Sequence, residues 1–215
     1  KRPQKPPELA IGPGFRPVAS WIAAIQQMGA PSASDADAAL IHEFPAIYGD
    51  HPELLEERRR AYLSLLDHAQ RVLGPDSPVF IVRAPGRVNI LGRHVDHQGG
   101  NCNLMAIDRE ILMAVHPRDD DQVNLHNVAH GTFDSRYFAI SDMLSRLPWD
   151  DWLSLVNSTQ VQEMVRSAAG DWSQYVRAAI LRLQKKFPTV KLRGMDMIVH
   201  GNIPIGAGLS SSSAL

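Results

Sequence analysis

Glycine and serine dominate residues 203–215, the run IPIGAGLSSSSAL, which lies between a predicted strand and a predicted helix. Glycines such as Gly206 and Gly208 let a backbone turn close to a ligand with its N–H groups pointing inward. A helix N-terminus adds partial positive charge, and a serine hydroxyl can bind Mg²⁺ at a phosphate. The pattern predicts a phosphate site, with a flexible Gly/Ser linker as the alternative. It is not a Walker A loop, because the lysine of that motif is absent.

A second stretch, residues 84–101, crowds polar side chains into a glycine-bracketed turn. Six of them fall within nine residues: Arg93, His94, Asp96, His97, Gln98 and Asn101. This is more hydrogen-bonding capacity than a surface turn requires, so we expect a polyhydroxylated ligand. The histidines and the aspartate could instead bind zinc or manganese. No HExxH spacing or further cluster of ligands supports that alternative.

Short β-rich runs surround both stretches and predict a sheet. They are separated by Gly, Pro and Asp, which favour turns. The predicted strands are residues 79–82, 88–91, 110–115, 122–127, 137–140 and 195–199. The last of these strands leads directly into the Gly/Ser run.

Apolar residues spaced three and four apart predict helices at residues 18–28, 50–73 and 172–187, and a short helix at 38–48. Asp50 followed three residues later by a glutamate has the form of an N-cap, and Gly74 ends the same helix. The charged block at residues 56–60 falls mostly on the outer face of this helix. We interpret it as a solvated face with ion pairs one turn apart, rather than a nucleic-acid patch.

Composition excludes several classes of protein. Hydrophobic residues make up 44% of the 215 and charged residues 21%, which is typical of a folded globular chain. With 22 Lys and Arg against 23 Asp and Glu, neither nucleic acid nor membrane is an expected partner. No apolar run approaches a membrane span or a signal peptide. The single cysteine, Cys102, excludes an intramolecular disulfide and fits a reducing compartment, so we expect a cytoplasmic location.

Changes in composition along the chain predict three segments. Residues 1–17 form a flexible arm, residues 18–76 a helical N-terminal extension, and residues 77–215 an α+β domain. The chain stops inside the Gly/Ser run, where a fold should not end. We therefore expect a longer protein with at least one more strand–helix unit downstream.

The two chemical stretches together resemble the GHMP kinases, small-molecule kinases named after galactokinase, homoserine kinase, mevalonate kinase and phosphomevalonate kinase. Residues 84–92, APGRVNILG, with His94, Asp96 and two following glycines resemble the galactokinase signature. Residues 204–214 resemble the phosphate-binding motif of the family. Shorter similarities extend back to Phe44, so the residues before it remain unexplained.

The resemblance implies roles for residues of the signature. Arg87 would be catalytic, lying near the transferred phosphoryl group and the sugar C1 oxygen and stabilising negative charge in the transition state. His94 and Asp96 would bind sugar hydroxyls. A structural salt bridge for Arg87 and a capped turn for the other two are the alternatives.

The resemblance also implies roles in the Gly/Ser run. Gly206, Gly208, Ser210 and Ser211 would cradle the phosphates of ATP. Ser212 would also bind the phosphates and supply the hydroxyl for Mg²⁺, although four successive serines allow that assignment to shift by one position.

Arg93 departs from the galactokinase pattern, which has a glutamate that contacts the sugar 6-hydroxyl at this position. An arginine cannot accept a hydrogen bond, but it can pair bidentately with a carboxylate. Arg93 would thus suit a uronic acid, and the run HVDHQGG at residues 94–100 is similar to that of plant galacturonokinases. Those kinases do not carry this arginine, so Arg93 could also turn outward, which leaves a neutral galactose-like substrate open.

By this resemblance the chain is the N-terminal domain of a GHMP kinase, similar to ribosomal protein S5 domain 2, behind a helical extension. The ferredoxin-like C-terminal domain and the family's catalytic aspartate would lie beyond this chain. The implied activity is that of an ATP- and Mg²⁺-dependent sugar 1-kinase of galactokinase type. Alternatives are a kinase for galacturonate, glucuronate or arabinose, a non-catalytic sugar and ATP sensor, and a fused module of unrelated activity.

Overall fold

A computed structural model describes residues 14–28, 44–92, 95, 98–145, 154, 157–167 and 170–215. Most of the predicted arm lies outside these residues. The helix predicted at 38–48 is described only from residue 44, and residues 44–48 are helical.

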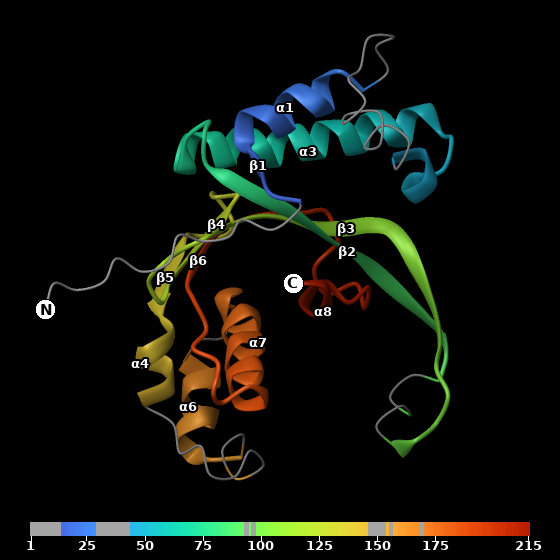
Figure 1. Cartoon of the computed structure of the whole chain (residues 1–215). Helices are drawn as coiled ribbons and strands as arrows, with labels where there is room; N and C mark the ends of the chain where they lie inside the picture. The colour runs from blue at the N-terminus through green and yellow to red at the C-terminus, as the bar shows by residue number, and fades with distance from the viewer. Residues whose placement is uncertain are drawn as a thin grey trace, which may run out of the picture.

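The described chain forms one six-stranded sheet (Figure 1). Its strands are β1 (Arg16–Pro17), β2 (Pro78–Leu91), β3 (Asn103–Pro117), β4 (Gln122–Asn127), β5 (Arg136–Ala139) and β6 (Met195–Gly201). Their order is β1-β2-β3-β6-β4-β5, and every pair is antiparallel except β4 with β6. All six predicted strands are present, but the two predicted at 79–82 and 88–91 are parts of the single long β2.

Helices cover both faces of the sheet, so its central strand is buried on both sides. In β3, Leu112 and Ala114 pack toward one helical layer, whereas Ile111, Met113 and Val115 pack toward the other. This double burial explains the continuous apolar run, because alternate residues of a strand point to opposite faces. The predicted α+β fold class is confirmed.

Above the sheet in Figure 1 lie α1 (Val18–Gln26) and α3 (Pro52–Leu73). Their buried side chains share one core with β2, β3 and β6, and Leu65 and Leu66 are fully buried in it. The helical segment is thus packed directly on the sheet, while the predicted division at residues 76 and 77 stays a prediction.

The start of α3 corrects one prediction. Asp50 is not the N-cap; His51 takes that position and Pro52 is the first helical residue. Proline suits this position because its φ is already helical and its missing N–H would have no partner in the first turn. The predicted end is confirmed, since Gly74 follows the helix with a φ of 93°.

Below the sheet lie α4 (Ile140–Ser145), α6 (Thr159–Ser167), α7 (Ser173–Lys186) and the short α8 (Ser211–Ala214) (Figure 1). The helix predicted at 172–187 is confirmed as α7, which buries Val176 and Ile180 against the sheet. Tyr175 and Leu183 of the same helix are about half exposed. Among the described helices, none has the length and apolar character to cross a bilayer.

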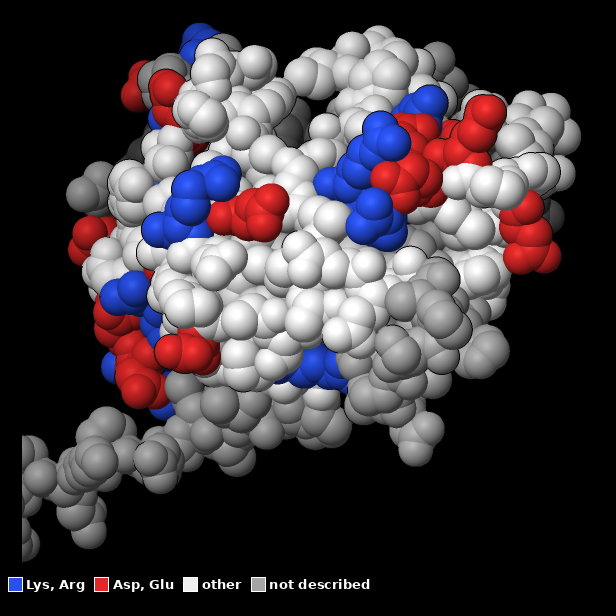
Figure 2. Space-filling view, turned by 90° about the horizontal axis from the view of Figure 1, so that it is seen from above, with Lys and Arg blue, Asp and Glu red and all other residues white. Residues whose placement is uncertain are grey.

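The charged block of α3 agrees only partly with its interpretation as a solvated face. Glu56 pairs with Arg59 and Arg60, three and four residues later, as predicted. Figure 2 views this helical face, where acidic and basic side chains lie beside one another in small clusters. Arg58, however, is only 1% exposed. It belongs to the apolar stripe of α3, four residues before the buried Tyr62, and points toward the sheet.

Beyond the core, β2 and β3 continue as a curved hairpin that leaves the sheet (Figure 1). The regular pairing of the two strands is interrupted at Gly86. Between the pairs Pro85–Glu110 and Arg87–Ala106, one residue of β2 faces three of β3. Such a bulge bends a strand pair and increases its twist. The residue immediately after it, Arg87, is exposed.

Candidate functional site

The bulge brings the two chemical stretches into contact. Arg87 Nε donates to Ser210 Oγ over 3.0 Å, and Arg87 N–H donates to the carbonyl of Leu209 over 3.2 Å. Arg87 and Ser210 are 123 positions apart in the sequence. The predicted catalytic arginine and the predicted phosphate turn therefore form one site, at the point where β2 leaves the sheet.

The backbone of the Gly/Ser turn has the form expected of an anion-binding loop. Gly206 and Gly208 have φ values of 74° and 72°, and no other atoms lie within 4 Å of where a Cβ would stand. Ser210 has a φ of 64° and is the one non-glycine residue with positive φ in the described chain. Strain of this kind concentrates at ligand sites. The helix predicted after the turn is α8, which is only four residues long.

The serines of the turn differ in exposure. Ser210 and Ser211 are half-buried, whereas Ser212 is exposed. Their hydroxyl oxygens are hard ligands of the kind that Mg²⁺ prefers. The open glycine backbone and these oxygens fit a magnesium-bound nucleotide phosphate.

Both ends of the turn are attached to the hairpin strands. At its start, Asn202 N–H donates to the carbonyl of Glu110 over 3.1 Å, and Asn202 Oδ1 accepts from the Glu110 N–H over 2.8 Å. At its end, the Leu209 carbonyl accepts from Arg87 and lies 3.1 Å from where a Cβ of Gly86 would stand. Residues 202–209 are thereby held between β3 and β2.

The tip of the hairpin carries the second predicted set of ligand-binding residues. Gly92, with a φ of 84°, packs so closely on Asn101 that a Cβ would overlap the Asn101 carbonyl. Cys102 Sγ donates to the Gly92 carbonyl over 2.9 Å, and Gly100 N–H donates to the Val95 carbonyl over 2.8 Å. The described residues on the two sides of the tip are therefore joined at Gly92 with Cys102 and at Val95 with Gly100. Arg93, His94, Asp96 and His97 lie outside the described residues.

A buried ionic cluster lies behind the phosphate turn, on the α3 side of the sheet. Glu110, 1% exposed, accepts from Tyr48 Oη over 2.8 Å and from Arg58 Nη1 over 3.4 Å, and also pairs with Arg83 Nε. Arg58 makes a second ion pair with the half-exposed Glu57. A buried carboxylate is stable only when paired and hydrogen-bonded in this way.

Burial in this cluster shifts the pKa values of its neutral members. Desolvation, with Tyr62 and Glu110 nearby, raises the pKa of Tyr48 far above its usual value, so Tyr48 remains a donor to Glu110. Desolvation also raises the pKa of Tyr62, whose hydroxyl lies 3.2 Å from that of Tyr48. The pKa of His200 is lowered, first by desolvation and then by the charge of Arg58.

Sequence reasoning missed this cluster and two asparagines. The signals were available: Glu110 is a carboxylate at the head of an apolar strand, and Arg58 follows the helical spacing of the buried stripe. Asn202 gave no signal in the sequence beyond its place before the turn. Asn89 lies two residues from Arg87 on β2, and its buried Oδ1 has no hydrogen-bond partner among the described residues.

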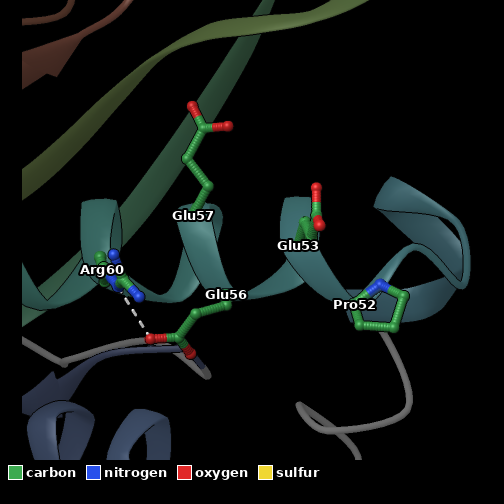
Figure 3. Close-up of a pocket in the computed structure, with 5 residues that line it drawn as sticks. All are labelled: Pro52, Glu53, Glu56, Glu57 and Arg60. Carbon is green, nitrogen blue, oxygen red and sulfur yellow. Dashed lines mark hydrogen bonds and ion pairs between the residues drawn. The ribbon is translucent and has the colours of Figure 1, made fainter.

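A pocket on the first turns of α3 lies apart from this site (Figure 3). Its lining is Pro52, Glu53, Glu56, Glu57 and Arg60. In Figure 3 Arg60 points to Glu56, with which it pairs over 2.9 Å, while Glu57 points away from that pair. None of the predicted site residues lines it. Within the described part of the chain, no three His, Cys, Asp or Glu side chains are grouped so that they could hold a metal ion.

Two family models match the stretches that the fold joins. Residues 68–117 match the galactokinase galactose-binding signature. Residues 174–215 match the N-terminal domain of the GHMP kinases. The first match contains the whole β2–β3 hairpin, and the second contains α7 from its second residue, β6 and the phosphate turn.

Similar proteins agree with both matches. A galactokinase of Chloroflexus aurantiacus is 32% identical over 138 residues, and one of Dictyostelium discoideum is 29% identical over 164 residues. These alignments cover 64% and 74% of this chain, which spans 29% of the length of each relative. A crystal structure of Lactococcus lactis galactokinase complexed with galactose shares the fold, with a TM-score of 0.50 and 23% identity over 69% of this chain and 32% of that one. Matched in sequence on both halves of its site, and in fold, the chain is similar to galactokinases of the GHMP kinase family.

Proposed function

We propose that the chain is the nucleotide- and sugar-binding N-terminal part of an ATP-dependent sugar 1-kinase of galactokinase type. The reaction transfers the γ-phosphoryl group of ATP to the anomeric hydroxyl of a galactose-like sugar or its uronic acid. The contact of Arg87 with Ser210 is the observation that carries the proposal, because it joins a positive side chain to a phosphate turn. A cytoplasmic location stays a prediction.

Arg87 is suited to stabilise the transferred group. Its guanidinium is exposed and permanently charged, and one of its N–H groups is already fixed on Ser210. The remaining donors are available for a phosphoryl oxygen or for the sugar C1 oxygen. Phosphoryl transfer depends mainly on positioning and on stabilising charge in this way.

The turn is suited to hold the phosphates of ATP. The open backbone at Gly206 and Gly208 accepts close approach of an anion, and Ser210 and Ser211 offer hydroxyl donors beside it. Ser212 would hold Mg²⁺, which neutralises phosphate charge when bound. His94 and Asp96, at the hairpin tip, would bind the sugar hydroxyls.

The choice of sugar depends on Arg93 in this proposal. A guanidinium at this position would pair with a carboxylate at C6 of the sugar, which favours a uronic acid over galactose. With Arg93 turned outward, a neutral galactose-like sugar would be preferred instead.

The test is an ADP-release assay on the full-length protein with galactose and galacturonic acid side by side. Arg87→Ala should lower turnover about 100-fold or more, as loss of a transition-state donor does in other enzymes. Arg93→Glu should shift preference from the acid toward the neutral sugar, while Arg93→Lys keeps the charge and should shift it less.

Two results would count against the proposal. Equal ranking of the two sugars in the wild type and in Arg93→Glu would remove the argument from charge. Binding of ATP and sugar with no product from any sugar of a panel that includes glucuronate and arabinose would favour the sensor alternative.

A further inference from the structure

Glu110 connects the helical layer that contains α3 to the start of the phosphate turn. Its side chain points into the α3 layer, where Tyr48 and Arg58 bind it. Its backbone lies in the sheet, where both of its polar groups bind Asn202 at the start of the phosphate turn. One residue therefore joins the helical layer to the turn.

The backbone bonds between Glu110 and Asn202 form a reciprocal pair. They follow directly after the last regular pair of β3 with β6, Ile111 with Gly201. The amide side chain of Asn202 thus supplies the acceptor that the departing backbone of β6 no longer provides. Two bonds to the backbone of one residue fix both the position and the direction in which the turn leaves the sheet.

The side-chain bonds of Glu110 fix the orientation of its backbone N–H and C=O groups. The carboxylate is almost fully buried and contacts donors from three elements: the helix at residues 44–48, α3 and β2. A carboxylate bound on three sides in a low-dielectric interior resists rotation, because any movement leaves a buried charge or donor without its partner.

We infer that Glu110 is a positioning residue for the phosphate turn, held by Tyr48 and Arg58 and acting through Asn202. Helix 44–48 and α3 are then part of the support of the site, although among the described residues no hydrogen bond or ion pair joins them to residues 203–210. The inference deepens the proposed function and rests on it only for the nucleotide measurement described below.

The test uses variants of the full-length protein that weaken the connection without removing the charge of Glu110. Tyr48→Phe deletes one donor to the carboxylate, and Asn202→Ala deletes the acceptor of the Glu110 N–H. Tyr62→Phe is the matched control, because its hydroxyl contacts that of Tyr48 but not the carboxylate. Glu110→Gln is avoided, since it would leave two arginines short of a buried partner.

Hydrogen exchange of the Asn202 and Arg87 amides, whose hydrogen bonds hold the two ends of the turn, is the first measurement. Tyr48→Phe and Asn202→Ala should each speed exchange there about tenfold, the equivalent of about 1.4 kcal/mol in local opening. Tyr62→Phe should change it less than about twofold. Exchange in β4 and β5 should be the same in all the variants.

The second measurement compares how each variant changes the KM for ATP and the KM for the sugar. Both test variants should raise the former several-fold and leave the latter near its wild-type value. A lower melting temperature with unchanged exchange in the turn would overturn the inference, because Glu110 would then only stabilise the fold. A response of Asn202→Ala alone would overturn the part assigned to the side chain of Glu110.

Failure of the proposed function would look different. A protein that binds no nucleotide, yet loosens its turn in Tyr48→Phe and Asn202→Ala, would refute the kinase proposal and leave the positioning inference standing.

Discussion

Gly86 is the residue on which the geometry of the site depends most directly. It lies in the bulge between Pro85 and Arg87, with the turn packed against it. A Cβ at this position would stand 3.1 Å from the Leu209 carbonyl, 3.2 Å from the Arg109 carbonyl and 3.2 Å from Ile107 Cδ1. Gly86→Ala therefore forces at least one backbone carbonyl to move by a few tenths of an ångström.

The carbonyl of Leu209 is the group that can move, because the Arg109 carbonyl is part of β3. Its displacement would weaken the bond from Arg87 N–H, at 3.2 Å already at the long end of the normal range. Overpacking of this kind costs about 1–3 kcal/mol, and a weakened hydrogen bond up to about 1 kcal/mol more. We expect a loss of about 2 kcal/mol, or about 4–8 °C in melting temperature for a chain of this size.

Two assays separate the local effect from the global one. Thermal unfolding gives the stability, and ADP release at saturating sugar gives the KM for ATP. Gly131→Ala is the matched control, because its Cβ would meet no other atom within 4 Å. We expect Gly86→Ala to raise the KM for ATP about tenfold, with Gly131→Ala within experimental error of the wild type in both assays. Gly86→Ala behaving like Gly131→Ala would refute the role given to this contact.

Three further predictions concern the framework. Gly194→Ala would place its Cβ inside the backbone of Gln122, so it should lower the free energy of unfolding in urea by at least about 3 kcal/mol. The KM for ATP of the folded fraction should stay unchanged, and a raised KM would contradict this. Leu66→Ala, in the fully buried stripe of α3, should cost about 2–5 kcal/mol, and a cost near zero would mean that the helical layer is not part of the cooperative fold. His200 has a folded-state pKa below its ordinary value of 6.5, so its contribution to stability is present above pH 6.5 and lost as pH falls through the lowered pKa. His200→Gln should therefore make the free energy of unfolding less dependent on pH below 6.5. Parallel curves of unfolding free energy against pH for the variant and the wild type would refute this.

The fold could be predicted largely from local patterns, because most elements have strong ones. The apolar run of β3 and the three- and four-residue apolar spacing of α3 and α7 each matched the elements that form. The joining of two predicted strands into β2 could not be foreseen, since Ala84-Pro85-Gly86 reads as a turn. In the structure this segment stays paired with β3, and the irregularity is absorbed by the bulge.

The site could be predicted only where glycines and hydroxyls mark it. The phosphate turn and Arg87 are of this kind, and their contact follows from strand order rather than from sequence distance. The cluster around Glu110 depends on long-range packing of α3 against β3, which no local spacing reveals. Arg58 illustrates the difficulty: the same charged block holds a surface pair and a fully buried arginine.

The position of the site at the edge of the core follows from the same packing. Residues 110–115 of β3 are buried on both faces, whereas residues 103–106 are exposed. The bulge lies between these two regions and Asn202 binds Glu110 at the end of the buried one, so the turn is anchored on the buried part of β3. Arg87 extends from the adjacent exposed part of the strand pair. In the proposed reaction the anchored turn would hold the phosphates while the exposed side admits the acceptor, because phosphoryl transfer depends on how its two substrates are positioned.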